Sequence, residues 1–213
     1  MKKIGISLGW NCSSAVYEVE NKIRQTKIDG YLTCPFDELV SNLPGILLCI
    51  KNDFNNFVNE EYLELVQNTD EIKLLNINFN HDGLVFRHKE YKFIFNHEGP
   101  SELHLKEKWP GGINHFIDNN YLKFKERYQQ RINNFKNYLN DKNNYIIFII
   151  KYAMDDNNTI NFHNVIREKY PDLKYECCFL KNNVNDLLNH LLLMGFDKND
   201  EEVKRLQNIQ DLR

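Results

Sequence analysis

Several patterns that mark common classes of protein are missing from this sequence. No stretch of about 20 apolar residues is present that would cross a membrane. Residues 1–8 are too short and too polar for the apolar part of a signal peptide. There is no H-E-x-x-H, G-x-G-x-x-G or Walker A pattern. We therefore expect a cytoplasmic protein, or one of the host cytoplasm if the source is a virus, without a metal site and without motif support for a nucleotide cofactor.

Cysteine pairs at metal-binding or redox spacing are also missing. The five cysteines are an odd number, and none of them forms a C-x-x-C motif; they are Cys12, Cys34, Cys49, Cys177 and Cys178. A disulfide framework uses an even set, and a zinc ribbon needs two closely spaced pairs. We expect free thiols in a reducing compartment.

Charge of one sign is not concentrated anywhere in the chain. The net charge is −3, and the one basic stretch, residues 123–136, is interrupted by Glu126. We interpret this stretch as the solvated face of a helix and expect no nucleic-acid partner. Hydrophobic residues at 42% and aromatics at 13% suffice for a core and exclude a disordered chain. No linker divides the 213 residues, so we expect a single domain over residues 1–213.

The hydrophobic pattern predicts the α/β class. Residues 4–8 form a short apolar run and 145–150 the most hydrophobic run, so both are expected to be buried strands. The last third alternates strand, helix and strand, which predicts parallel strands. The middle third is typical of antiparallel hairpins, with strands expected over 72–79, 84–86 and 91–95. In the first helix, Val16 and Val19 are expected on one face. We predict a mixed β-sheet flanked by helices. The expected helices are 12–21, one from Pro44, 60–66, 116–139, 160–170 and 200–212; residues 185–194 fit helix or strand.

Cys12 stands where the first strand meets the first helix, which is the best candidate position for chemistry. A helix N-terminus lowers the pKa of a thiol, and its unpaired N–H groups can hold an oxyanion. Gly9 and Trp10 break the strand before it, and Asn11 or Ser13 can cap the helix. Asn11 can also donate to the oxyanion. The alternative interpretation is that Cys12 is a small buried core residue.

A cysteine nucleophile needs a base, which is usually a histidine oriented by a third group. Of the seven histidines, His97 follows a strand and precedes Glu98, and His115 follows a glycine pair before the long helix. We rank His97 first and His115 second. Asp37 can orient a histidine, bind a substrate hydroxyl or cap the next segment.

Arg127 and Arg131 lie one turn apart on the long helix and share a face. Two guanidinium groups at this spacing can clamp a phosphate or a carboxylate. The competing interpretation is that they form salt bridges with nearby acids.

Four short motifs in order resemble one known family. They are Ile6-Ser7-Leu8-Gly9-Trp10-Asn11-Cys12, then Pro35-Phe36-Asp37, then Phe95-Asn96-His97-Glu98, then an arginine-bearing helix, 124–135, before a hydrophobic strand. Together they resemble the papain-like cysteine peptidase family long of unknown function. The resemblance covers roughly residues 4–155. The family usually has Trp after Pro-Phe-Asp, where this chain has Glu38.

The resemblance implies Cys12 as nucleophile and His97 as base, with Glu98 or Asp37 as a third member. It implies a hydrolase that acts on a peptide through a Cys12 thioester and needs no cofactor. Gly9, Asn11 and Cys12 are also similar to an element of a capsular-polysaccharide family that binds coenzyme A, which implies transfer of an acyl group to a sugar. A catalytically inactive binding module is the non-enzymatic alternative.

Overall fold

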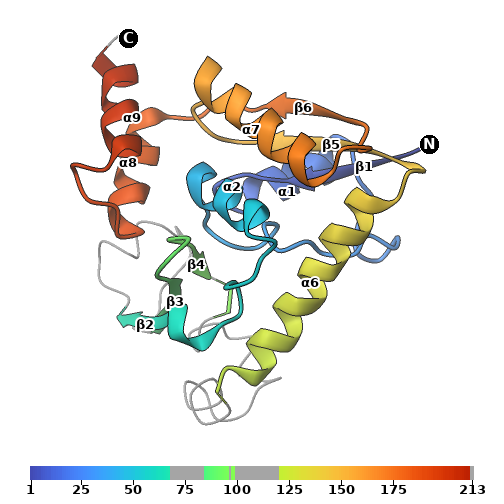
Figure 1. Cartoon of the computed structure of the whole chain (residues 1–213), viewed down its shortest axis with the longest axis horizontal. Coiled ribbons are helices and arrows are strands. Elements are labelled where there is room, and N and C mark those ends of the chain that lie inside the picture. Colours follow the sequence, from blue (N-terminus) through green and yellow to red (C-terminus); the bar gives the residue numbers. More distant parts are fainter. Residues whose placement is uncertain (68–83, 96, 99–119, 212–213) are drawn as a thin grey trace.

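The structure is a computed structural model that describes residues 1–67, 84–95, 97–98 and 120–211 (Figure 1). Its strands form two three-stranded sheets among these residues. One sheet is parallel, in the order β1 (Lys2–Ser7), β5 (Asn144–Ile150), β6 (Tyr175–Phe179). The other is antiparallel, in the order β2 (Leu63–Gln67), β3 (Leu84–His88), β4 (Ile94–Phe95). The helices are α1 (Ser13–Glu20), α2 (Leu43–Lys51), α6 (Leu122–Asn140), α7 (Asp156–Lys169), α8 (Val184–Leu193) and α9 (Glu201–Asp211), with a 3-10 turn at Glu60–Tyr62.

The α/β class predicted from the sequence is confirmed. Parallel and antiparallel pairing both occur as expected, but they are divided between two sheets instead of sharing one. β1 and β5 are both largely buried, and β5 is the middle strand of the parallel sheet. One hydrophobic cluster joins residues from the parallel sheet, the antiparallel sheet and the helices.

The parallel sheet follows from the two apolar runs and the helices that connect them. Lys2 pairs with Asn144 and Ser7 with Ile149, so the carboxyl ends of β1 and β5 lie side by side. The backbone N–H of Leu8 donates to the carbonyl of Ile149 at 2.9 Å and continues the pairing beyond β1. In open parallel sheets, binding sites lie at the carboxyl ends of the strands. The residues that follow β1 and β5 therefore stand where a binding site is expected.

Two segments of the middle third differ from expectation. Residues 60–66 were expected to be a short helix, but they form the 3-10 turn and then β2, because pairing with β3 overrides the local helical spacing. The strand expected over 91–95 is reduced to β4, since Lys92 has a φ of 54° and the N–H of His88 bonds the carbonyl of Phe93. The strand expected over 72–79 lies outside the described residues.

The terminal elements are helical. The segment 185–194, which fitted helix or strand, is helical: residues 185–193 lie in α8 and Met194 is its C-cap. α8 packs against α9. The N-cap of α8 is Asn183, whose side chain accepts from the N–H of Asn185. Across the described parts of the chain, no helix combines the length and apolar character needed to cross a bilayer.

Aromatic packing holds α6 against the antiparallel sheet and the loop before α2. Tyr128 of α6 meets Phe95 of β4 at 5.0 Å and Phe57 at 5.4 Å between ring centroids. Phe36 meets Phe135 of α6 at 5.8 Å. These aromatic residues are close in sequence to the charged residues described below, on α6, after β4 and after Phe36. Their packing therefore brings the charged groups of these three segments close together.

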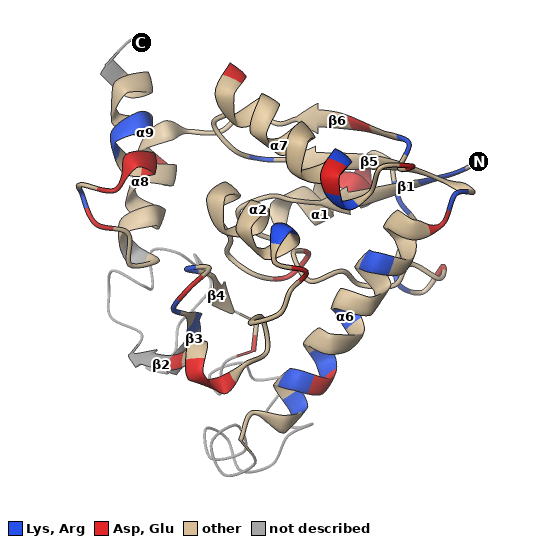
Figure 2. Cartoon of the chain, viewed as in Figure 1, with Lys and Arg blue, Asp and Glu red and all other residues tan. Residues whose placement is uncertain are grey.

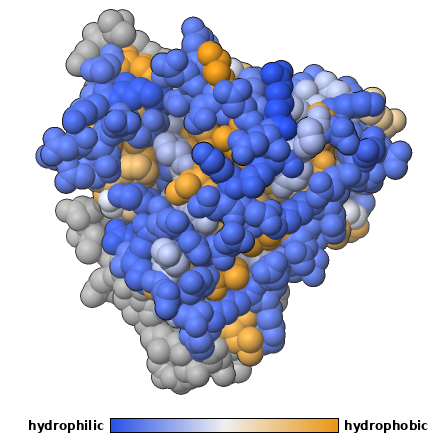
Figure 3. Space-filling model, viewed as in Figure 1, coloured by the Kyte–Doolittle hydropathy of each residue, from blue (hydrophilic) through white to orange (hydrophobic). Residues whose placement is uncertain are grey.

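Charges of both signs are spread over the helices and loops, and several Lys and Arg residues lie along α6 (Figure 2). On the face drawn in Figure 3, hydrophobic residues form small separate spots among hydrophilic ones. The part of this face that the structure describes therefore has no broad apolar patch of the kind that marks an interface.

Candidate active site

The turn between β1 and α1 is fixed by glycine and by a neighbouring serine. A Cβ built on Gly9 would lie 1.6 Å from the Oγ of Ser14, so only glycine fits. Ser41 donates its N–H to the carbonyl of Trp10 at 3.0 Å and its hydroxyl to the carbonyl of Gly9. The turn thus places Cys12 at the start of α1, as predicted, but the N-cap is Cys12 itself and not Asn11 or Ser13.

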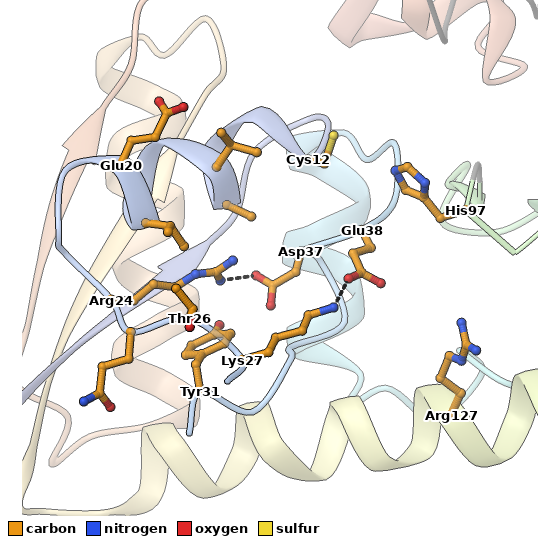
Figure 4. Close-up of a pocket in the computed structure, with 14 residues that line it drawn as sticks. Cys12, Glu20, Arg24, Thr26, Lys27, Tyr31, Asp37, Glu38, His97 and Arg127 are labelled. Atoms are coloured by element: carbon orange, nitrogen blue, oxygen red, sulfur yellow. Dashed lines mark hydrogen bonds and ion pairs between the residues drawn. The ribbon is translucent and has the colours of Figure 1, made fainter. Parts of the chain in front are cut away.

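Cys12 is half-buried and opens on a cavity of about 620 Å³ (Figure 4). The cavity runs between α1, the loop that follows it, the Pro-Phe-Asp segment and the turn after β4. It is lined by Cys12, Ala15, Val16, Val19, Glu20, Arg24, Gln25, Thr26, Lys27, Tyr31, Asp37, Glu38, His97 and Arg127. A pocket of this size accommodates a small-molecule ligand.

The expectation of a lowered pKa for the Cys12 thiol is wrong for this structure. Burial raises its pKa most, and the charge of Glu38 raises it further. A hydrogen bond from its own backbone N–H and the charge of Lys151 lower the pKa without reversing the net rise. The thiol makes no capping hydrogen bond in α1. A group in this state carries its proton at neutral pH, so nucleophilic attack requires a base.

Asn11 and Ser13 form a small polar chain beside the thiol. The Oδ1 of Asn11 accepts from the N–H of Ser13 at 3.0 Å and from the Ser13 hydroxyl. Lys151, the residue directly after β5, donates from Nζ to the Ser13 Oγ at 2.9 Å. Since the amide oxygen of Asn11 faces α1, its Nδ2 is the end that can serve a substrate.

Trp10 supports this turn from the opposite side. It is only 8% exposed, and its ring meets His190 of α8 edge-on at 4.0 Å between centroids. Lys151 Nζ lies 5.9 Å from the same ring. Burial lowers the pKa of His190, which favours a neutral packing partner. Trp10 is therefore part of the wall behind the turn and does not line the cavity.

His97 lines the same cavity as Cys12. Figure 4 shows its ring on the Cys12 side of the cavity, with the Glu38 carboxylate below both. Burial alone would raise the pKa of Glu38, but Arg131, Lys27 and His97 together lower it to about 2. Glu38 is therefore ionised and electrostatically coupled to His97. The second histidine candidate, His115, lies outside the described residues.

Asp37 belongs to a buried cluster next to the cavity. Its Oδ1 accepts from Arg24 at 2.8 Å and its Oδ2 from the N–H of Cys34 at 2.8 Å. Arg24 also lies 2.9 Å from Glu18, which is fully buried. Figure 4 shows Asp37 turned toward Arg24, away from Cys12. Of the roles left open for Asp37, the structure thus supports a structural one, through its contacts with Arg24 and the backbone of Cys34.

Glu98 and the two arginines form an ion-pair network. Arg127 donates to both carboxylate oxygens of Glu98 at 2.9 and 3.0 Å, and Arg131 lies 3.5 Å from the same carboxylate. Arg131 also donates to Glu38. The interpretation of the arginines as salt-bridge partners therefore describes them best. The carboxylate of Glu98 has no exposed surface and is held by these two arginines of α6.

Two contributors were missed from the sequence. Glu38 follows the Pro-Phe-Asp motif directly, and its departure from the family's usual Trp was the only signal. Lys151 follows the most hydrophobic strand, and the rule that parallel sheets carry sites at their carboxyl ends was sufficient to single it out. Within the described part of the chain, no three His, Cys, Asp or Glu side chains gather as metal ligands do.

Comparison with models of known protein families gives a match over most of the chain. The model of a family described as "Putative papain-like cysteine peptidase" matches residues 3–185. The chain belongs to this family. The match to the papain-like cysteine peptidase family extends from β1 into α8, so it includes the turn with Cys12, the turn with His97 and all of α6. No curated protein and no solved structure matches the chain significantly.

Proposed function

We propose that this chain is a cysteine-dependent hydrolase that forms a thioester on Cys12 with His97 as its base. One observation carries the proposal: two residues far apart in the sequence, a thiol at a helix start and an imidazole, open on one cavity. Membership of the papain-like family supports the same reaction class. The proposal needs no cofactor.

The reaction proceeds in two balanced halves. His97 removes the thiol proton as the sulfur of Cys12 attacks the carbonyl carbon, and the tetrahedral intermediate collapses when the bond to the leaving group breaks. The proton on His97 goes to the leaving group. In the second half, water gives a proton to His97 as its oxygen attacks the thioester carbon. The bond from that carbon to the Cys12 sulfur then breaks, which releases the carboxylic acid, and the sulfur takes the proton from His97 to restore the thiol.

Glu38 is the third member in this proposal, in place of Asp37 or Glu98. Its ionised carboxylate stabilises the imidazolium that forms when His97 holds the thiol proton. Asn11 Nδ2 and the N–H groups at the start of α1 stabilise the oxyanion. Lys151, fixed on the Ser13 hydroxyl, adds a positive charge on the side where negative charge develops.

Transfer of an acyl group from coenzyme A to a sugar is the alternative. It requires cations for the phosphates of coenzyme A, and Arg127 and Arg131 are the candidates from the sequence. Both are engaged by Glu98, and Arg131 is also engaged by Glu38. A phosphate would have to displace a buried carboxylate, so hydrolysis is the better-supported reaction.

The test is acylation followed by intact-mass measurement. Wild-type protein incubated with an activated ester or with acetyl-coenzyme A is expected to gain one acyl mass. Cys12→Ala is expected to gain none, whereas Cys178→Ala, which removes another half-buried thiol, should be acylated normally. His97→Ala should slow acylation by about 10²–10⁴-fold.

Adducts that persist in Cys12→Ala would contradict the proposal. If no donor adds mass to Cys12 while both forms bind the same ligands equally, the chain is a binding module and not an enzyme.

A further inference from the structure

Helix α1 buries two polar residues and directs two valines toward the cavity. Ser14 and Glu18, one turn apart, are fully buried against the core, while Val16 is 50% exposed and Val19 is half-buried. Both valines line the cavity, together with Ala15. Aliphatic side chains normally pack in the core, and local departures from that rule concentrate at functional sites. Here the departure gives the cavity an aliphatic wall.

The charged residues of the wall are largely neutralised by one another. Arg24 is bound between Asp37 and Glu18, at 2.8 and 2.9 Å. Lys27 pairs with Glu38. The head groups of these side chains are committed to one another. On α1 the residues that line the cavity between Cys12 and the terminal Glu20 are all aliphatic, namely Ala15, Val16 and Val19.

The described residues that line the cavity include no strand edge with which a bound peptide could form main-chain hydrogen bonds. Every described residue around the cavity belongs to α1, α6, a turn or a loop. Recognition of an extended peptide commonly uses main-chain hydrogen bonds to a strand edge. An aliphatic chain needs no such bonds, since it binds by burial of apolar surface.

We propose that the acyl group transferred to Cys12 is a medium-length aliphatic chain that lies along α1 from Cys12 to Val19. The distance along the helix axis between these residues is about 10 Å. The inference rests on the proposed function, in which the acyl carbon bonds to the sulfur of Cys12 and the bond to the leaving group breaks. The substrate class that follows is esters, thioesters or amides of aliphatic carboxylic acids.

The first experiment measures the rate of Cys12 acylation with a series of straight-chain nitrophenyl esters from acetyl to decanoyl. If each added methylene leaves water, the rate constant relative to the acetyl ester should rise about fourfold per methylene until the groove is filled. A rate that is flat or falling from acetyl to octanoyl overturns the inference, although acylation itself would still support the proposed function.

Two variants locate the chain. Val16→Asp and Val19→Asp put a charge on the apolar side and should remove the preference for octanoyl over acetyl. Ile160→Asp is the matched control, because Ile160 is 57% exposed on α7, away from the cavity, and it should keep the preference. An unchanged preference in both valine variants overturns the inference.

A binding measurement separates the two proposals. Cys12→Ala, which cannot be acylated, should bind octanoate at least tenfold more tightly than acetate, and Val16→Asp in the same background should abolish the difference. If no ester acylates Cys12 but this difference is seen, the proposed function fails and the aliphatic site remains. Equal affinities for the two acids overturn the aliphatic site.

Discussion

At the scale of single residues, the protonation state of Cys12 is the most informative property of the site. Its thiol has a raised pKa, so the rate at which iodoacetamide alkylates Cys12 in the folded protein should increase with pH. This rate should reach half its maximum at a pH above the ordinary pKa of a cysteine. Rates measured across pH with peptide mapping of Cys12 check this. A half-maximum on the acid side would instead indicate a preformed thiolate–imidazolium pair.

The charged residues around the thiol predict in which direction the pKa of Cys12 should shift when each is replaced. Glu38→Gln removes a negative charge and should lower the pKa of Cys12, whereas Lys151→Met removes a positive charge and should raise it. Lys151→Arg is the matched control, because it keeps the charge and can keep the bond to Ser13. Opposite shifts of the two charge-removing variants are required; shifts of the same sign would show that they act through the fold.

Glu18 is expected to make stability depend on pH. Burial raises its pKa to about 9, since one Arg24 cannot neutralise both Glu18 and Asp37. From about pH 4.5 upward the unfolded chain loses this proton while the folded chain keeps it, so stability falls as pH rises toward 9, by up to about 1.4 kcal/mol per unit.

Glu18→Gln removes that titration. The variant should be more stable than the parent at about pH 8 and should lose most of this advantage at about pH 5, measured by urea unfolding. Glu20→Gln, on the exposed side of the same helix, should show no such pH dependence. A Glu18→Gln variant that is less stable at both pH values would indicate that the charged pair with Arg24 stabilises the fold.

At the scale of elements, the β1–α1 turn depends on Gly9. Gly9→Ala brings its Cβ into the Ser14 side chain and should cost about 1–3 kcal/mol of unfolding free energy. Ser14→Ala removes the buried hydroxyl and should recover part of that loss in the double variant. Denaturation of the four proteins completes the cycle, and strictly additive effects would show that the two residues do not interact.

The elements also show where sequence patterns succeed. β5, α6, α7 and α9 were predicted because their hydrophobic spacing agrees with their burial. The segment 60–66 was not, since a strand partner decided it. The valines of α1 were expected on one face, and they are, but their spacing does not reveal that this face lines a cavity. Periodicity identifies the apolar side of a helix, and only the fold shows what covers that side.

At the scale of the whole molecule, the candidate site is assembled from segments that no local pattern connects. Cys12 could be singled out because a strand, a glycine and a helix surround it in the sequence. His97 could be ranked, but its link to Glu38 could not. The third member was sought in Asp37 and Glu98, yet arginines hold both. Aromatic packing of α6 against Phe36 and Phe95 sets where the arginines of α6 meet Glu38 and Glu98, and that packing is not visible in the sequence.

The pairing of β1 has a consequence for synthesis of the chain. The only partner of β1 among the described strands is β5, which follows α6 and therefore leaves the ribosome long after Cys12. Contacts between such distant segments form late and slowly. The turn that presents Cys12 can be completed only when β5 and Lys151 arrive. A nascent chain thus carries a thiol with an ordinary pKa, and the buried setting that raises the pKa of Cys12 is completed only after residue 151 has been made.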